Sequence, residues 1–279
     1  MKKKILIIGK KSFVTSVLKD NLKKFFFLKI INFENFLKIK KSYLTDFNHI
    51  INCSLNRKYV TKKYDIKNDF DLIIAEKIKS YDIRYVYFST RKVYKLGNNL
   101  KENSVKKPKS FYSKNKLITE KKLFSILKKK VLILRVSNLI GYSKTLSSRK
   151  IHNTFIDQFF LNIKKGYIID NKKNYKDFLS SDQFSKIIEM LIKKKTHGIY
   201  NVSIGKKVYL HDIIKWLNFH NTNSYTVKKL PKYYSQQNFY LNNSKLIKTL
   251  NIKLSLTKLE KDCKRISKLY FKKWKKRLR

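Results

Sequence analysis

Tyr112 and Lys116 are the residues whose types and spacing point most directly to acid-base chemistry. They stand four positions apart, so on a helix both side chains lie on the same face. A nearby ammonium favours the phenolate, and we therefore expect Lys116 to lower the pKa of Tyr112 toward the working range of a proton-transfer catalyst. The spacing is weak evidence by itself, because the chain holds 18 tyrosines. It recurs at Tyr59/Lys63 and at Tyr225/Lys229.

The residues around this pair follow a specific order. Along the chain this order is FSTRKVY (88–94), Glu102, Pro108, FYSKNK (111–116) and Glu120. It resembles the extended short-chain dehydrogenase/reductase family, the group of nucleotide-sugar epimerases, dehydratases and dTDP-4-dehydrorhamnose reductases. In that family a Ser or Thr stands shortly before a Val-Tyr or Val-Phe pair, which here is Val93-Tyr94. The family's catalytic hydroxyl therefore falls on Thr90, with Ser89 beside it as the alternative.

The resemblance implies an NAD- or NADP-dependent enzyme acting on a nucleotide-linked sugar. In such enzymes the hydroxyl orients the substrate oxygen, the tyrosine moves the proton and the lysine holds the nicotinamide ribose. By resemblance these roles pass to Thr90, Tyr112 and Lys116, and Ser89 is expected to contact substrate. Dehydratases usually have an acidic residue directly after the Thr position, where this chain has Arg91, so we favour a 4-keto reductase or an epimerase. The alternative is structural: a threonine at a strand end and a tyrosine packed on a helix.

The turn after the first predicted strand is where a dinucleotide pyrophosphate would bind, because N–H groups at a helix N-terminus favour an anion. Extended reductases have Gly-x-x-Gly-x-x-Gly there, and this chain keeps only Gly9, with Ser12 and Thr15 in the other two positions. A Cβ at position 12 should crowd the pyrophosphate, and one at position 15 should push the helix off the strand. The alternative is an ordinary strand-to-helix turn with Ser12 as N-cap.

The other cofactor contacts are expected at the ends of later strands. The acidic residue that would bind the adenosine ribose of NAD has no clear counterpart, since Asn32 ends the second strand and Glu34 follows two residues later, and the choice between NAD and NADP stays open. Ile50–Ser54 resembles the family's segment beside the nicotinamide nucleotide. The expected cofactor-binding residues are thus Gly9, Ser12, Phe13, Val14, Asn32, Cys53, Ser54 and Lys116.

The resemblance continues toward the C-terminus. LRVSNLIG (134–141) looks like the family's Leu-Arg-x-x-Asn-x-x-Gly, whose asparagine contacts the substrate diphosphate, so Asn138 is a candidate substrate residue. KDFLSSDQF (176–184) is similar to its Arg-Asp-Phe segment, with Lys176 in place of the arginine, and residues 198–213 and 241–260 resemble later family segments. Arg149 is a second substrate candidate, which with His152 could reach a phosphate; a solvated loop is the alternative.

Alternating apolar segments predict an α/β fold, a Rossmann-type doubly wound parallel sheet with a smaller α/β C-terminal substrate lobe. Strands are expected at Lys4–Ile8, Leu28–Ile31, His49–Cys53, Arg84–Ser89, Val131–Arg135, Tyr167–Ile169 and Gly198–Val202. Helices are expected at Phe13–Leu22, Phe70–Lys79, Ser110–Lys129, Ile151–Lys164 and Ser181–Lys194. We expect a dinucleotide-binding domain over residues 1–145, to which about 172–202 contributes, and a mainly substrate-binding lobe over 146–279.

The formal charge of +49 would ordinarily point to nucleic acid or an anionic membrane. Here lysine is spread along the whole chain, Arg is scarce and residues with AT-rich codons abound, so genomic base composition explains the charge and no nucleic-acid partner is expected.

Cys53 and Cys263 lie far apart and the five histidines are scattered, so neither a disulfide nor a metal site is expected. No apolar run is long enough for a membrane span. We expect a cytoplasmic protein, with a homodimer paired through the Ser110–Lys129 helix left open.

Two other functions remain open. The missing glycines allow a non-catalytic member of the same fold, a scaffold or regulatory subunit that has lost cofactor binding. The charge allows a basic nucleic-acid binder, whose DNA affinity would fall steeply with salt.

Overall fold

The structure is a computed structural model that describes residues 2–141, 155–170, 172–229 and 237–275. Its centre is a six-stranded sheet in the order β10-β5-β4-β3-β1-β2, and every pairing in it is parallel. The strands are β1 (Lys4–Ile8), β2 (Phe27–Ile31), β3 (His49–Asn52), β4 (Arg84–Thr90), β5 (Val131–Val136) and β10 (Gly198–Val202). The chain passes from β1 to β2 on one side and then returns to β3 on the other, so the strand order reverses at β1.

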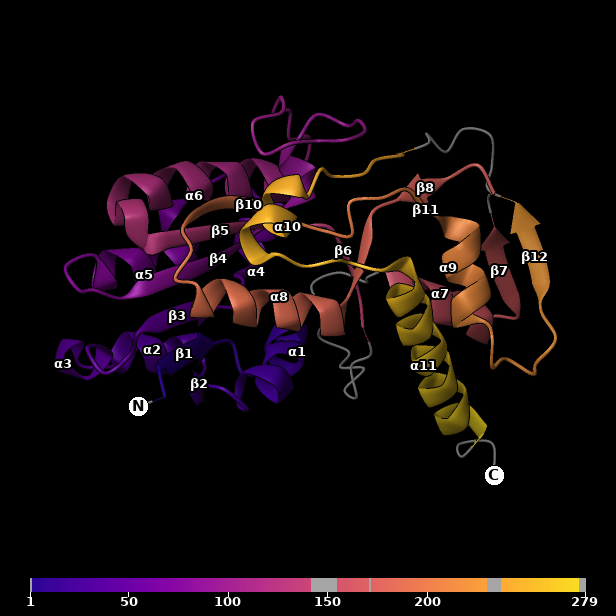
Figure 1. Cartoon of the computed structure of the whole chain (residues 1–279), viewed down its shortest axis with the longest axis horizontal. Coiled ribbons are helices and arrows are strands. Elements are labelled where there is room, and N and C mark those ends of the chain that lie inside the picture. The colour runs from indigo at the N-terminus through magenta and orange to yellow at the C-terminus, as the bar shows by residue number, and fades with distance from the viewer. Residues whose placement is uncertain (1, 142–154, 171, 230–236, 276–279) are drawn as a thin grey trace.

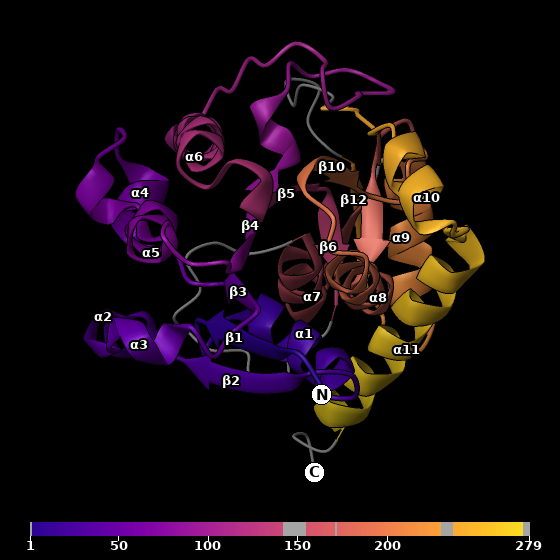
Figure 2. The same cartoon turned by 60° about the vertical axis from the view of Figure 1, so that its left-hand side comes forward.

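Helices cover both faces of this sheet. Successive side chains of a strand point to opposite faces, and here the side chains on both faces are apolar. Ile5 and Ile7 pack in one cluster with helices α1, α8 and α10, whereas Leu6 and Ile8 pack in another with α2, α5 and α6. Figure 2 shows α4, α5 and α6 on one side of the sheet, with α1 and α8 on the other. These helices are α1 (Phe13–Leu22), α2 (Phe33–Lys38), α3 (Lys41–Leu44), α4 (Arg57–Thr61), α5 (Phe70–Ile78), α6 (Phe111–Leu127), α8 (Ser181–Lys193) and α10 (Ser244–Leu250). The predicted doubly wound α/β fold is confirmed.

The remaining described elements gather at one end of the molecule around an apolar cluster of their own (Figure 1). They comprise three two-stranded pairs, β6 with β9, β7 with β12 and β8 with β11, and three helices. Their bounds are β6 (Asn138–Ile140), α7 (Phe155–Lys164), β7 (Tyr167–Asp170), β8 (Tyr175–Lys176), β9 (Phe178–Ser180), β11 (Val208–Tyr209), α9 (Leu210–Leu217), β12 (Thr226–Lys229) and α11 (Leu256–Lys275). Short 3₁₀ turns lie at η1 (Ile66–Asn68), η2 (Arg91–Val93) and η3 (Lys128–Lys130).

The chain crosses between the two groups of elements more than once. β9 leads directly into α8, which packs beside α1, and β10 then joins the edge of the central sheet next to β5. The expected domain boundary at residue 145 and the first residues of the helix expected from Ile151 lie outside the described residues. Among the described helices, none combines the length and apolarity needed to cross a membrane.

Candidate functional site

The predicted cofactor residues lie together at the carboxyl edge of the sheet. Gly9 follows β1, Asn32 follows β2, Cys53 and Ser54 follow β3, and Thr90 ends β4. Backbone hydrogen bonds join the first three strand ends: the Gly9 N–H donates to the Ile31 carbonyl at 2.8 Å, and the Cys53 N–H donates to the Ile8 carbonyl at 2.7 Å. In open α/β sheets ligands bind at this edge, where the strand order reverses.

Gly9 is required by its backbone conformation and by its neighbours. Its φ is +113°, which side chains disfavour, and a Cβ on it would lie 2.8 Å from the Ser54 nitrogen. The close passage of β1 past the end of β3 therefore depends on this glycine.

Ser12 and Thr15, which replace the family's second and third glycines, have local partners. The Ser12 hydroxyl caps α1 by accepting the Val14 N–H at 3.2 Å. Thr15 is 2% exposed and donates its hydroxyl to the Gly9 carbonyl at 2.7 Å. The Thr15 hydroxyl thus joins α1 to the turn after β1, and the expectation that its Cβ pushes the helix off the strand stays a prediction.

The first turn of α1 still offers donors to an anion. Its opening N–H groups have no partner inside the helix, and those of Phe13 and Thr15 have no acceptor among the described residues. The ring of Phe13 projects toward Gly141, on which a Cβ would lie 2.6 Å from the Phe13 Cζ. The Asn32 side chain makes no capping bond at the start of α2. These residues fit a dinucleotide, although the Ser12 side chain narrows the approach to the turn.

The end of β3 is held by its own side chains. Asn52 accepts both the N–H of Ser54, at 3.0 Å, and its hydroxyl, at 2.7 Å. Burial raises the pKa of the Cys53 thiol to about 12. The Cys53 thiol is thus protonated at neutral pH.

Lys116 is a buried cation on α6. The helix begins at a reciprocal cap in which Ser110 and Ser113 bond each other's backbone N–H, and this fixes the first turn that carries Tyr112. Lys116 is 3% exposed, with its ammonium 4.4 Å from the centre of the Tyr87 ring and 3.8 Å from a carboxylate oxygen of Asp71. No acceptor among the described residues lies within hydrogen-bonding distance of this ammonium.

Asp71, at the start of α5, was not predicted as a site residue. Its carboxylate accepts hydrogen bonds from the Asn52 amide at 2.9 Å and from the Tyr85 hydroxyl at 2.6 Å, and it faces Lys116. Asp69 lies two residues earlier, and burial followed by the charge of Asp71 raises its pKa to about 6. Nothing in local sequence marks these carboxylates, because their partners come from other elements.

Tyr112 lies one turn before Lys116, but its pKa moves opposite to our expectation. Burial raises the pKa of Tyr112 to about 12, and the negative charge of Asp71 adds to the rise. The prediction that this pKa lies below its ordinary value is wrong, chiefly because Tyr112 is buried and secondly because the charge of Asp71 adds to the rise. Tyr112 therefore keeps its proton at neutral pH.

Thr90 and Ser89 differ in what they contact. Thr90 is 8% exposed, and its hydroxyl oxygen accepts the Lys92 N–H at 3.3 Å, which leaves its hydrogen to donate elsewhere. Ser89 donates to the Glu120 carboxylate instead, on the α6 side of the strand. Of the two hydroxyls, Thr90 is the one whose proton has no acceptor among the described residues.

Glu120 also holds the arginine of the LRVSN segment. Arg135 donates from Nε to one carboxylate oxygen at 3.0 Å and from Nη2 to the other at 2.5 Å, and its Nη1 donates to the Tyr94 hydroxyl at 2.9 Å. Both side chains are buried. This pair fixes α6, and with it Tyr112 and Lys116, to β5.

Of the predicted substrate residues, the structure describes Ser89 and Asn138 but not Arg149. The Asn138 amide donates to the Asp177 carbonyl at 3.0 Å, so it joins β6 to the turn between β8 and β9. Arg149 and His152 lie outside the described residues. No group of three or more His, Cys, Asp or Glu within the described ranges could hold a metal ion.

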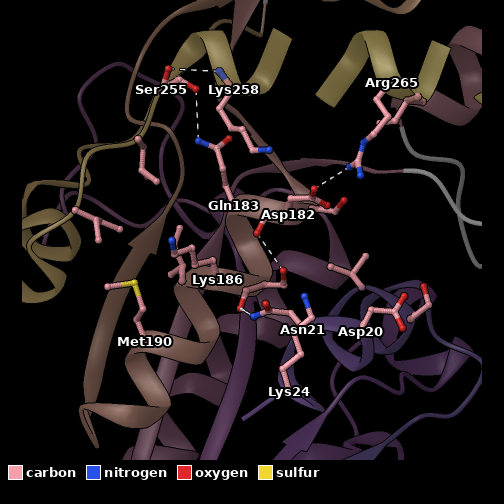
Figure 3. A pocket seen from close by; sticks show the side chains of 18 of the residues that line it. Asp20, Asn21, Lys24, Asp182, Gln183, Lys186, Met190, Ser255, Lys258 and Arg265 are labelled. Atoms are coloured by element: carbon pink, nitrogen blue, oxygen red, sulfur yellow. Dashed lines mark hydrogen bonds and ion pairs between the residues drawn. The ribbon is translucent and has the colours of Figure 1, made fainter. Parts of the chain in front are cut away.

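A groove of about 1010 Å³ lies elsewhere, between α1, α8, α11 and the segment before α11 (Figure 3). Two of its polar side chains bond other groups that line it: Gln183 donates to the Ser255 main-chain carbonyl at 3.4 Å, and Arg265 pairs with Asp182 at 2.9 Å. None of the predicted site residues lines it. The groove is therefore separate from the edge of the sheet where the site residues gather.

Comparison with known proteins gives a likeness in fold. No family model matches the chain, and no curated protein matches its sequence. Among solved structures, UDP-N-acetylglucosamine 4-epimerase from Methanobrevibacter ruminantium M1, in complex with UDP-N-acetylmuramic acid, is 19% identical with a TM-score of 0.80, covering 98% of this chain and 100% of that one.

Two further structures are similar over nearly the whole chain. The dTDP-4-dehydrorhamnose reductase of Bacillus anthracis str. Ames, in complex with NADP, is 16% identical with a TM-score of 0.74, covering 95% of this chain and 99% of that one. The dTDP-glucose 4,6-dehydratase of the same strain, in complex with NAD, is 17% identical with a TM-score of 0.71, covering 97% of each chain. All three are extended short-chain dehydrogenase/reductase enzymes, the group that the sequence motifs resemble. At these identities the likeness establishes the fold.

Proposed function

We propose that this chain is an NAD(P)-dependent oxidoreductase or epimerase that acts on a nucleotide-linked sugar, and that it is a 4-keto reductase or an epimerase and not a dehydratase. The motif order around Tyr112 and Lys116 and the likeness to epimerases, a reductase and a dehydratase over nearly the whole chain support this kind of reaction. Several of those structures hold NAD, NADP or a nucleotide sugar.

The observation that carries the proposal is the state of Lys116. A buried ammonium normally has hydrogen-bond acceptors around it, because burying such a donor without one is costly. Lys116 has an aromatic ring and a carboxylate at 3.8 Å but no acceptor within bonding distance among the described residues. Its unused donors, one turn after Tyr112, suit the ribose hydroxyls of a bound cofactor.

The other residues divide the work on the substrate oxygen. Thr90 donates a hydrogen bond to this oxygen and orients it, and Tyr112 transfers the proton. A bound nicotinamide would supply or accept the hydride at the ring carbon. A tyrosine with a pKa near 12 is protonated at neutral pH, and this is the form that can donate a proton to a carbonyl oxygen; the phenolate that oxidation of an alcohol requires is disfavoured.

The non-catalytic alternative keeps one observation in its favour. Ser12 caps α1 where the family has a glycine, and its side chain takes one of the N–H groups that would otherwise face the pyrophosphate. The same fold without cofactor binding would leave Lys116 and Tyr112 as packing residues.

The proposal also covers the positions of the two binding sites, the location in the cell and the oligomeric state. We place the dinucleotide site in residues 1–145 with about 172–202, and the substrate site mainly in 146–279. We expect a cytoplasmic location. A homodimer would pair through α6.

Tyr112→Phe tests the proposed chemistry. Turnover is measured on a panel of UDP- and dTDP-sugars, including 4-keto sugars, with NADH and NADPH. Loss of a positioned proton donor should reduce turnover about 100-fold or more. Tyr225→Phe is the matched control, because Tyr225 has the same spacing to a lysine but is 40% exposed. Unchanged turnover in Tyr112→Phe on every accepted substrate contradicts the mechanism.

A further inference from the structure

Three cations, two that follow β4 and one in β8, lie close enough for their charges to act on one another. Arg91 and Lys92 follow Thr90 directly in η2, and Lys176 is the second residue of β8, whose backbone pairs with Val208 of β11. None of the three has a carboxylate within ion-pairing distance among the described residues. We call Arg91, Lys92 and Lys176 the cation cluster.

Arg91 is held in one orientation by an aromatic ring and not by an acid. Its guanidinium carbon lies 3.6 Å from the centre of the Phe239 ring, and Phe239 is fully buried. Stacking of this kind fixes the plane of the guanidinium while leaving its edge free to bond. The Arg91 Nε is buried without a hydrogen-bond partner, so part of this donor set is prepared for an acceptor that the described chain does not provide.

The nearest acidic residue, Asp177, forms no ion pair with the cluster, although its charge favours the Arg91 cation. Asp177 follows Lys176 and is 0% exposed, but its carboxylate accepts backbone N–H groups of Leu241 at 3.0 Å, Ile204 at 3.1 Å and Gly205 at 3.2 Å. Those bonds join the segment of Asp177 to two others, one at Ile204 and Gly205 and one at Leu241. Asp177 is thus occupied by the fold.

Gathering these cations has an electrostatic cost. Burial, followed by the charges of Arg91 and Lys92, lowers the pKa of Lys176. Burial also lowers the pKa of Arg91 to about 10. Like charges that are partly buried together without a carboxylate partner are typical of sites that receive an ion of opposite sign.

We propose that the cation cluster binds a carboxylate carried by the sugar of the substrate, with Arg91 as its main contact. This inference rests on the proposed function and specifies its substrate class as an acidic nucleotide sugar. Arg91 is adjacent in sequence to Thr90, which that function places at the reacting oxygen. The diphosphate is attached at the anomeric carbon, on the other side of the ring from a reacting fourth carbon, so a group near Arg91 belongs to the sugar.

The test compares acidic and neutral ligands. Calorimetry measures the binding of UDP-glucose, UDP-glucuronate and UDP, and of the dTDP-linked counterparts, to the wild-type chain and to Arg91→Gln, Arg91→Lys and Lys95→Gln. Lys95→Gln is the control, because Lys95 follows the cluster closely in sequence, is exposed and lies outside the cluster. The substitution removes the same single positive charge as Arg91→Gln does. Thermal melting without ligand accompanies each variant.

The wild-type chain should bind the uronate at least about tenfold more tightly than the neutral sugar, because a charged bidentate contact is strong. Arg91→Gln should remove the preference for the uronate and leave the affinity for the free nucleoside diphosphate unchanged. Arg91→Lys should keep part of the preference for the uronate, and Lys95→Gln should keep all of it. The melting temperature of Arg91→Gln should fall only slightly, through loss of the stacking contact on Phe239, since Arg91 forms no ion pair with a described residue.

Three results overturn the inference. Equal affinity of the wild-type chain for acidic and neutral sugars shows that no carboxylate is recognised. An equal loss for all ligands in Arg91→Gln shows a diphosphate contact instead. Failure of the wild-type chain to bind any nucleotide sugar in either series contradicts the proposed function as well.

Discussion

Replacing Asp71 with Asn should destabilise the fold in a way that Lys116→Met largely reverses. The two charged groups lie 3.8 Å apart and both side chains are 4% exposed. Unit charges about 4 Å apart interact by about 4 kcal/mol at an effective dielectric constant of about 20. Asn at position 71 keeps an oxygen for the Tyr85 hydroxyl, so the substitution removes mainly the charge.

The single substitution should lower the free energy of unfolding by about 3–5 kcal/mol, because it leaves a buried ammonium without its counter-charge. Burial already lowers the pKa of Lys116, and Asp71 opposes that fall. In Asp71→Asn the folded state therefore releases this proton more readily than the unfolded chain does. Its stability should rise with pH until the unfolded lysine titrates near about 10.4.

Urea unfolding of the wild-type chain, both single variants and the double variant gives the coupling energy between the two groups. We expect about 3–4 kcal/mol. The control is the same cycle on Lys23 and Asp20, whose groups are 3.4 Å apart but 56% and 80% exposed. A coupling between Asp71 and Lys116 as small as that of such an exposed pair, below about 0.5–1 kcal/mol, would refute the buried-pair reasoning.

Two other predictions concern buried carboxylates that hold the site in place. Glu120→Gln should lower the free energy of unfolding by about 3–5 kcal/mol, because Arg135 would remain buried and charged; a loss below about 1 kcal/mol in urea unfolding would contradict this. Burial raises the pKa of Asp177 to about 7, so the folded state keeps a proton that the unfolded chain loses near pH 4. Stability should therefore fall by up to about 4 kcal/mol as pH rises from about 4 to about 7, and Asp177→Asn should remove that fall; an unchanged pH profile in the variant would exclude Asp177 as its source.

Part of this architecture could be predicted from sequence because it depends on local pattern. The apolar runs of β1, β4 and β5 and the helical spacing of α6 are each contained in one segment, and each was predicted within two residues. The same holds for the placement of Tyr112 and Lys116 one turn apart.

The electrostatics of the site depend on contacts between distant segments and could not be predicted in this way. The predicted direction of the Tyr112 pKa is wrong, because burial of the tyrosine by other segments raises this pKa and the charge of Asp71, 45 positions before Lys116, adds to the rise. The hydrogen bond from the Thr15 hydroxyl to the Gly9 carbonyl could not be predicted either, because it depends on how α1 follows the turn after β1.

The central claim is that Lys116 and the turn at Gly9 hold a nicotinamide dinucleotide. Calorimetric titration of the purified chain with NADH and with NADPH tests it directly. We predict saturable binding of one molecule per chain for at least one of them. Lys116→Met should weaken this binding about tenfold or more, because a hydrogen bond to a charged group contributes about 1.5–3 kcal/mol. Absence of binding by both dinucleotides at millimolar concentration would contradict the account and favour the non-catalytic alternative.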